Sequence, residues 1–257
     1  MNFIDTHLHL DESIKGSAFE AVNFLDSELE LAGIRRGVVL HLLIQRWPME
    51  EVGHALKSSR RLVGFVNVDP FGAQADKNLQ MAVEEYGFIG LKLHPRLQNF
   101  RLDEPLVHKL VRFAGEMDVP VLIDAFPDGT FLQQEFSVLS YSRIAHACPN
   151  TRIIVAHMGG HYVLDFMMLA KRIPNLYFDT SYSLLYYRGS SVPQNMIYAM
   201  QNMKFDRVFY GSDYPDRTIK DSLDSSLQEF NERSIPVEKI DRIFYQNAKE
   251  FFKWTDV

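Results

Sequence analysis

Two histidines close to the N-terminus have a spacing that suits metal binding. His7 and His9 lie two positions apart in the run Asp5-Thr6-His7-Leu8-His9, at the end of a short apolar segment. Side chains alternate along a strand, so both imidazoles are expected on the same face. Two imidazole nitrogens side by side suit a divalent ion such as zinc. The pair alone is a weak indication, because a hydrogen-bonded structural pair in the core explains it equally well.

Further candidate ligands follow other apolar segments. His157 ends one such segment and precedes two glycines, Asp124 ends another, and Asp213 follows a segment that contains Gly211. A glycine there permits a close approach of the backbone. Structural alternatives exist, with His157 as a packing or capping residue and Asp213 as the cap of the following helix. The common position of these residues after apolar runs favours one shared site.

The elements that would bring these residues together are predicted by alternation between short runs rich in Val, Ile and Phe and longer stretches with helical spacing. Eight apolar runs are expected as strands, at residues 3–8, 37–43, 62–68, 89–94, 120–125, 152–157, 175–180 and 207–212. Amphipathic stretches such as 17–33, 73–86 and 104–118 are expected as helices between them. The pattern predicts an α/β protein with a single (β/α)8 TIM barrel over residues 1–257.

A final amphipathic helix pair at residues 237–254 is expected to cap this barrel. The main competing architecture is an open doubly wound sheet, which normally has a glycine-rich phosphate loop after its first strand. Here the first strand ends in Thr6-His7-Leu8-His9 instead, which disfavours that alternative. In a barrel the C-terminal ends of all strands meet at one rim, where the active site lies.

Composition restricts the partners and the compartment. The chain has 257 residues, a formal net charge of -6 and one cysteine, Cys148, so no intramolecular disulfide can form. The acidic balance gives no reason to expect nucleic acid as a partner. No apolar run approaches the roughly 20 residues that span a bilayer, and the N-terminus does not resemble a signal peptide. We therefore expect a cytoplasmic protein with a small-molecule substrate and no membrane partner, and a homodimer is compatible with the exposed helices of a barrel.

The motifs at the strand ends resemble those of the amidohydrolase superfamily. Within it the chain is similar to the amidohydrolase-related (amidohydrolase 2) group, which includes metal-dependent hydrolases and nonoxidative decarboxylases of aromatic and muconate-type acids. The resemblance implies that His7 and His9 bind metal, that His157 binds metal or polarises substrate, and that Asp213 binds metal and handles protons. It covers almost the whole chain, through Ile4-Asp5-Thr6-His7-Leu8-His9, Gly90-Leu91-Lys92-Leu93-His94-Pro95, Pro120-Val121-Leu122-Ile123, Ala156-His157-Met158-Gly159-Gly160, Gly211-Ser212-Asp213-Tyr214-Pro215 and Gln246-Asn247-Ala248.

One position departs from the family pattern. The family usually has a metal-binding histidine at the end of the fifth strand, where this chain has Asp124. A carboxylate also ligates zinc, which is the metal we expect, but manganese or magnesium accepts oxygen more readily. The alternative is that Asp124 only supports the ligands, so that the site is weakened or empty.

Basic residues follow the fourth strand and are expected to bind substrate. Some superfamily members carry a carboxylated lysine on this strand, bridging two metals. We favour instead an ammonium on Lys92 that binds an anionic substrate together with His94 and Arg96, whose planar guanidinium suits a carboxylate.

The expected function is a metal-dependent hydrolase, acting through a metal-activated water on a small carboxylate-bearing amide, lactone or ester. In this mechanism Asp213 moves the proton and His157 stabilises the developing oxyanion. One alternative is a metal-dependent nonoxidative decarboxylase of an aromatic or muconate-type acid. The other is a noncatalytic ligand-binding barrel with a degenerate metal site.

Overall fold

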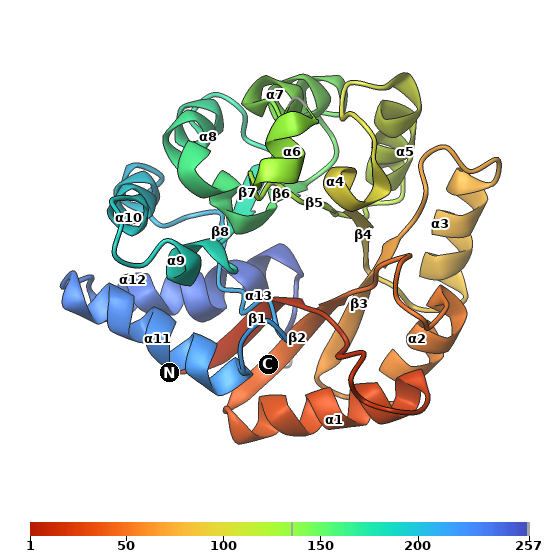
Figure 1. Cartoon of the computed structure of the whole chain (residues 1–257), viewed down its shortest axis with the longest axis horizontal. Coiled ribbons are helices and arrows are strands. Elements are labelled where there is room, and N and C mark those ends of the chain that lie inside the picture. The colour runs from red at the N-terminus through yellow and green to blue at the C-terminus, as the bar shows by residue number, and fades with distance from the viewer. Residues whose placement is uncertain (135, 256–257) are drawn as a thin grey trace.

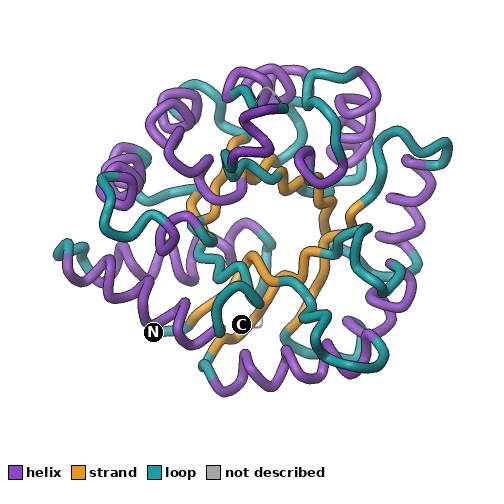
Figure 2. Tube along the Cα trace, in the orientation of Figure 1, coloured by secondary structure: helices purple, strands orange, loops and turns teal. Residues whose placement is uncertain are grey.

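Parallel strands form the centre of the molecule. The computed structural model describes residues 1–134 and 136–255. In this part of the chain, eight strands pair in sequential order into one parallel sheet, which appears as a ring in Figure 2. The backbone N–H of Thr6 donates to Tyr210 O (3.0 Å) and that of Asp213 to His7 O (2.9 Å), which closes the ring between the last strand and the first. The predicted (β/α)8 barrel is confirmed. The strands are β1 (Phe3–Leu8), β2 (Ile34–Leu40), β3 (Leu62–Asn67), β4 (Gly90–Leu93), β5 (Val121–Ile123), β6 (Ile153–Val155), β7 (Leu176–Asp179) and β8 (Val208–Phe209).

Helices surround the strand ring on its outside (Figure 1). The longer ones are α1 (Ala18–Leu31), α2 (Met49–Leu56), α3 (Ala75–Glu84), α5 (Pro105–Glu116), α7 (Val138–Ala147), α8 (Val163–Ala170), α10 (Val192–Asn202) and α11 (Ile219–Glu232). Short helices occupy the connections after four strands: α4 (Pro95–Gln98), α6 (Gly129–Gln133), the 3-10 segment η1 (Ala156–Tyr162) and α9 (Ser183–Tyr186). The three helical stretches predicted from the sequence correspond to α1, α3 and α5. Local sequence explains α1, since Ser17 and Glu20 form a capping box at its start.

Strand β2 begins earlier than expected. It starts at Ile34 rather than Gly37, and Ile34 is buried and pairs with Phe3 of β1. The two arginines between Ile34 and Gly37 concealed this strand start, because charged residues interrupt the apolar run that indicates a buried strand. Strand β1 has the predicted bounds, and the other six predicted strands are longer than the observed ones by residues at one or both ends.

The C-terminal segment fills one end of the barrel. Instead of the expected helix pair it forms one continuous helical run, in which α12 (Val237–Asp241) passes through a π-helical turn (Arg242–Gln246) into α13 (Asn247–Phe251). No glycine or proline interrupts residues 237–251, so the chain has no local reason to break there. The capping role itself is as predicted. Side chains of this run pack with the barrel interior in one buried cluster that contains Ile4, Val38, Leu40, Phe65, Leu122, Ile154, Ala156, Phe209, Tyr245, Ala248 and Phe251.

No helix in residues 1–134 or 136–255 combines the length and the apolar character that crossing a membrane requires.

Candidate metal centre

His7 and His9 lie together at the C-terminal end of β1. The Nε2 atom of His7 is 3.2 Å from Asp213 Oδ1, and that of His9 is 3.5 Å from the same oxygen. The prediction that both imidazoles face one side is thereby confirmed. Gly211 makes this approach feasible, since a Cβ atom at that position would lie 2.7 Å from His7 Cβ. Asp213, which follows β8, thus meets β1 at the point where the barrel closes.

His157 and Asp124 form a second imidazole–carboxylate pair beside His7. The Nε2 atom of His157 lies 3.2 Å from Asp124 Oδ1, and the rings of His157 and His7 have centroids 4.9 Å apart. His157 adopts a left-handed backbone conformation (φ 61°) in the 3-10 segment after β6. A non-glycine residue in this region is uncommon and strained, and such residues gather at functional sites.

Backbone carbonyls fix the tautomers of two of these histidines. The Nδ1 atom of His9 is 2.8 Å from Leu40 O, and that of His157 is 3.1 Å from Ser181 O. A carbonyl oxygen only accepts hydrogen bonds, so each Nδ1 carries the proton. In the neutral ring the Nε2 atom then has a lone pair, and it points at a carboxylate.

A similar arrangement holds His7. Its Nδ1 atom is 3.0 Å from Oδ2 of the buried Asp179. A carboxylate likewise accepts, so the Nε2 lone pair of neutral His7 faces Asp213. A nitrogen lone pair and a carboxylate oxygen at this separation repel one another unless a positive charge, a proton or a metal ion, lies between them. The donor set of imidazole nitrogens and carboxylate oxygens therefore fits a divalent cation.

The charges around His7 favour a cation as well. Burial alone would lower the pKa of His7, but the carboxylates of Asp179 and Asp213 outweigh it and raise the pKa to about 9. Burial opposes ionisation of Asp213, yet His7 and His9 hold its pKa well below its usual range. Two groups of residues bring their donor atoms within 4.8 Å of one another, and both include His7: one with His9 and Asp213, the other with His157 and Asp179.

Asp124 is fully buried and only partly satisfied. Burial opposes its ionisation, but His157 and the ammonium of Lys92 hold its pKa below the usual range. Its Oδ1 atom faces His157, whereas Oδ2 has no hydrogen-bond partner among the described residues and lies 3.7 Å from Arg96 Nε. A buried carboxylate oxygen without a hydrogen-bond partner destabilises the folded state, so this atom is suited to contact a ligand that is bound in the functional protein.

The predicted substrate residues have different environments. Lys92 on β4 is buried beside the acidic residues, and burial lowers its pKa against the opposing effect of Asp124 and Asp213. Its ammonium has no carboxylate within 4 Å among residues 1–134 and 136–255. Arg96 instead pairs with Asp128 through Nη1 (2.7 Å), so its guanidinium is already partly neutralised at the edge of the site.

His94 lies between the centre and a helix start. Its Nδ1 atom accepts a hydrogen bond from Leu97 N (3.4 Å) at the first turn of α4 and is 3.6 Å from Asp124 Oδ2. Burial lowers the pKa of His94 to about 3, so the ring is neutral at physiological pH. A neutral imidazole offers hydrogen bonding to a substrate but no charge.

Sequence reasoning missed two residues of this centre, Asp179 and Ser181. Asp179 is the last residue of β7 and is fully buried, as is Ser181 two positions later. The available indication was the one used for Asp213, a carboxylate at the end of an apolar strand. His41 and His161 lie outside the centre: His41 is buried and bonds to Trp47 O, and His161 is exposed and bonds to Tyr187 OH.

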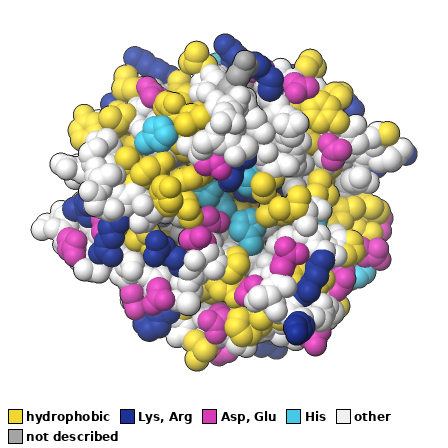
Figure 3. Space-filling view, viewed as in Figure 1, with side chains coloured by type: hydrophobic (Ala, Val, Ile, Leu, Met, Phe, Trp, Pro, Cys, Tyr) yellow, Lys and Arg dark blue, Asp and Glu magenta, His cyan; other side chains and the backbone are white. Residues whose placement is uncertain are grey.

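Aromatic side chains flank the centre on one side. Phe126, in the loop after β5, has its ring centroid 5.9 Å from that of His157 and 4.8 Å from that of Tyr182. Tyr182 in turn stacks on Tyr186 (4.9 Å). Figure 3 shows histidine and acidic side chains at the centre of this face, with apolar side chains around them. The polar centre therefore has an apolar and partly aromatic surrounding.

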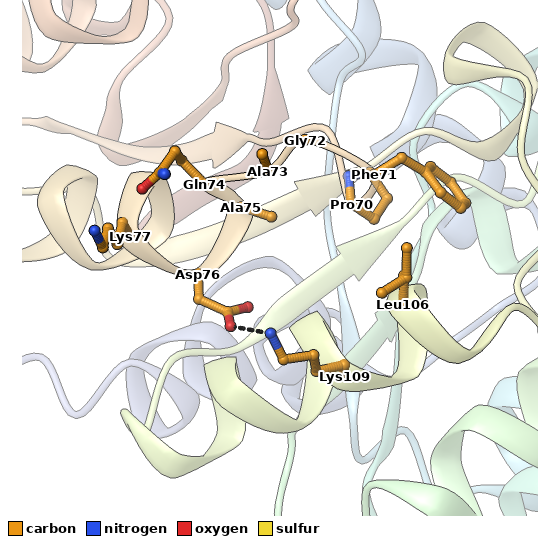
Figure 4. Close-up of a pocket in the computed structure, with 10 residues that line it drawn as sticks. All are labelled: Pro70, Phe71, Gly72, Ala73, Gln74, Ala75, Asp76, Lys77, Leu106 and Lys109. Carbon is orange, nitrogen blue, oxygen red and sulfur yellow. Dashed lines mark hydrogen bonds and ion pairs between the residues drawn. The ribbon is translucent and has the colours of Figure 1, made fainter.

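A separate cavity of about 370 Å³ lies at the start of α3 (Figure 4). It is lined by residues 70–77, which form the loop before this helix and its first turn, together with Leu106 and Lys109 of α5. Lys109 forms an ion pair with Asp76, drawn as a dashed line in Figure 4, so the ammonium of Lys109 already has a partner. The lining contains no histidine, and none of the predicted site residues belongs to it.

The fold and the strand-end histidines and carboxylates define a TIM barrel with a candidate metal centre at its C-terminal rim. The family described as Amidohydrolase matches residues 4–254, so the chain belongs to the amidohydrolase family. The membership predicted from the sequence motifs is confirmed, and it makes the chain an enzyme of the amidohydrolase superfamily. Comparison with curated proteins finds no match.

Solved structures with the same fold cover nearly the full length. An uncharacterised TIM-barrel protein from Bordetella bronchiseptica is 16% identical with a TM-score of 0.80, over 98% of this chain and 99% of that one. A probable 2-pyrone-4,6-dicarboxylic acid hydrolase from Acinetobacter baumannii, with citric acid bound, is 19% identical with a TM-score of 0.68, over 99% and 100%. A dihydroxybenzoic acid decarboxylase from Polaromonas sp. JS666, with bound manganese and the inhibitor 2-nitroresorcinol, is 16% identical with a TM-score of 0.66, over 98% and 97%.

Proposed function

We propose that this chain is a metal-dependent hydrolase that adds water to a small carboxylate-bearing amide, lactone or ester, within a single domain of residues 1–257. The observation that carries the proposal is the set of three imidazoles whose Nδ1 protons are held by oxygen atoms. This leaves the Nε2 atoms of His7 and His9 facing Asp213, and that of His157 facing Asp124. Family membership supports metal dependence.

These five residues are the proposed ligands of a divalent ion, with zinc or, because of Asp124, manganese or magnesium as the occupant. Such an ion supplies Lewis acidity and lowers the pKa of a bound water toward about 7. Asp213 accepts the proton of the attacking water and delivers it to the leaving nitrogen or oxygen as the bond to the carbonyl carbon breaks. His157 has an alternative role: if its Nε2 atom carries a proton instead of binding the ion, it donates a hydrogen bond to the developing oxyanion. The buried ammonium of Lys92 binds the substrate carboxylate.

The decisive experiment combines metal analysis with product analysis. We expect the purified protein to bind zinc or manganese, to lose turnover on treatment with a chelator and to regain it when either metal is added. In heavy-oxygen water one labelled oxygen should enter the product acid. Asp213→Asn should lower kcat by about 100-fold or more, the range for loss of a general acid–base, while metal remains bound. Unchanged turnover would remove Asp213 from this role.

Nonoxidative decarboxylation of an aromatic or muconate-type acid is the second candidate. The aromatic side chains beside His157 favour it, because Phe126 and Tyr182 provide apolar surface for a planar ring. The fold of the Polaromonas decarboxylase is consistent with it. Release of carbon dioxide without incorporation of labelled oxygen would identify this reaction. Near-zero metal after incubation with zinc and manganese would contradict both reactions and favour a noncatalytic binding barrel.

A further inference from the structure

Residues at and just after the end of β7 contact two of the three central histidines at their Nδ1 atoms, on the side away from Nε2. We propose that Asp179, assisted by the hydroxyl of Ser181, is a positioning residue that fixes the tautomer of His7 and so makes its Nε2 atom available to a metal ion. The inference rests on the metal centre of the proposed function. Both residues are fully buried.

One carboxylate oxygen of Asp179 is held in place by donors. Its Oδ1 atom accepts the backbone N–H of His157 (2.9 Å) and that of Ser181 (3.1 Å). The hydroxyl of Ser181 donates to the same oxygen. These partners include two main-chain groups, which cannot rotate away, so the orientation of the carboxylate is determined by the backbone.

The other oxygen then faces His7. Asp179 Oδ2 lies 3.0 Å from His7 Nδ1, and because it only accepts, this nitrogen carries a proton. The Nε2 atom of His7, 3.2 Å from Asp213 Oδ1, keeps its lone pair for a metal ion when the ring is neutral. Carboxylates that accept from the outer nitrogen of a ligating histidine fix its tautomer and strengthen it as a ligand.

Ser181 links the two imidazoles. Its Oγ atom is 3.0 Å from His7 Nδ1 and 2.9 Å from His157 Nδ1. Since the hydroxyl proton is given to Asp179, the oxygen lone pairs are turned toward the two Nδ1–H groups. The segment after β7 therefore orients a histidine from β1 and one from β6 at the same time.

A second metal ion held by His7, His157 and Asp179 is the competing explanation, since their donor atoms lie within 4.8 Å of one another. Both Nδ1 atoms and both carboxylate oxygens already have hydrogen-bond partners, however. An ion there would have to displace the Nδ1 protons. Hydrogen bonding explains the group without that cost.

Asp179→Asn tests the proposal, because the two backbone N–H groups determine how the asparagine side-chain amide is oriented. Its oxygen stays with the two N–H groups, so its NH2 group faces His7 Nδ1, and two donors meet. This disfavours the Nδ1–H tautomer and favours a proton on Nε2, the atom that faces Asp213. Ser181 can still accept from His7, so the single variant should weaken zinc affinity about 10-fold, and Asp179→Asn with Ser181→Ala about 100-fold.

Two measurements are needed: the zinc Kd by competition with a coloured chelator, and proton–nitrogen NMR of the zinc-loaded protein with labelled histidine. The wild type should show a hydrogen-bonded Nδ1–H on His7. Asp165→Asn, which alters an exposed carboxylate on α8, should leave both readouts unchanged.

An unprotonated His7 Nδ1 in the zinc-loaded wild type, or an unchanged Kd in the double variant, overturns the positioning role alone. A wild type that binds neither zinc nor manganese overturns the proposed function with it. The wild-type spectrum decides the question even if the variants do not fold.

Discussion

The Nε2 atom of His157 lies 3.2 Å from Oδ1 of Asp124, so the strand ends of β6 and β5 meet in a buried imidazole–carboxylate pair. The Nδ1 proton of His157 is committed to the carbonyl oxygen of Ser181. The pair therefore needs a shared positive charge, and as a proposed metal ligand Asp124 would provide an oxygen donor where the family resemblance leads us to expect a histidine. This relationship determines which metal the centre should prefer.

Replacing Asp124 should change the metal preference. Asp124→His exchanges an oxygen donor for a nitrogen donor, which zinc accepts better than manganese does. We expect the ratio of the manganese Kd to the zinc Kd to rise by about tenfold or more. Asp128→Asn is the matched control, since Asp128 also contacts Arg96 but not His157. Equal ratios in the wild type and Asp124→His would show that Asp124 does not bind the metal.

Gly211→Ala should displace His7. The new Cβ atom would lie 2.7 Å from His7 Cβ and 3.0 Å from Ser181 Cβ, closer than side chains pack. Overpacking of this kind costs about 1–3 kcal/mol of folding free energy and shifts the neighbouring side chains. Urea unfolding and a zinc titration should both report the change. Gly129→Ala is the control, because a Cβ there meets no atom within 4 Å. Normal zinc affinity in Gly211→Ala would mean that His7 does not depend on this close approach.

Lys92 should bind the carboxylate of substrates that carry one. Lys92→Met removes the buried ammonium, and loss of a hydrogen bond to a charged group of about 1.5–3 kcal/mol corresponds to a roughly 10- to 100-fold higher KM. The corresponding methyl ester, which lacks the charge, should be affected little. Intact-protein mass spectrometry should find no added carboxyl group on Lys92. Equal effects on the acid and its ester would argue against the anchoring role.

Acid stability should depend on His41. Burial lowers the pKa of this imidazole from 6.5 to about 4, so the unfolded chain binds its proton more tightly than the folded one. This contribution to stability is present above pH 6.5 and is lost as the pH falls toward 4. Between pH 7 and pH 5 the loss of folding free energy from this group amounts to about 2 kcal/mol.

His41→Asn should remove this part of the acid sensitivity while keeping an acceptor for the N–H of Asn67. Urea unfolding at pH 7 and pH 5 measures the difference, and His146→Asn, at an exposed position, is the control. A variant that loses as much stability as the wild type over this range would show that another group is responsible.

Much of the architecture could be predicted from the sequence. Apolar runs of β-branched residues alternate with amphipathic stretches along the whole chain, and this local pattern is sufficient for a (β/α)8 barrel. Strand parity placed His7 and His9 on one side, and the shared rim of a parallel barrel brought His157 and Asp213 toward them. The start of β2 was missed because Arg35 and Arg36 interrupt its apolar run.

The remainder depends on contacts between residues far apart in the chain. Nothing near Asp179 in the sequence indicates that its two oxygens reach His7 and His157, because those distances arise only when β7 lies beside β6 and close to the β1–β8 junction. The pairing of Arg96 with Asp128, which occupies an expected substrate anchor, likewise follows from the loop after β5 folding beside α4. Sequence periodicity determines the order and the faces of the strands, whereas hydrogen-bond partners and tautomers are decided by the packing of strand ends in three dimensions.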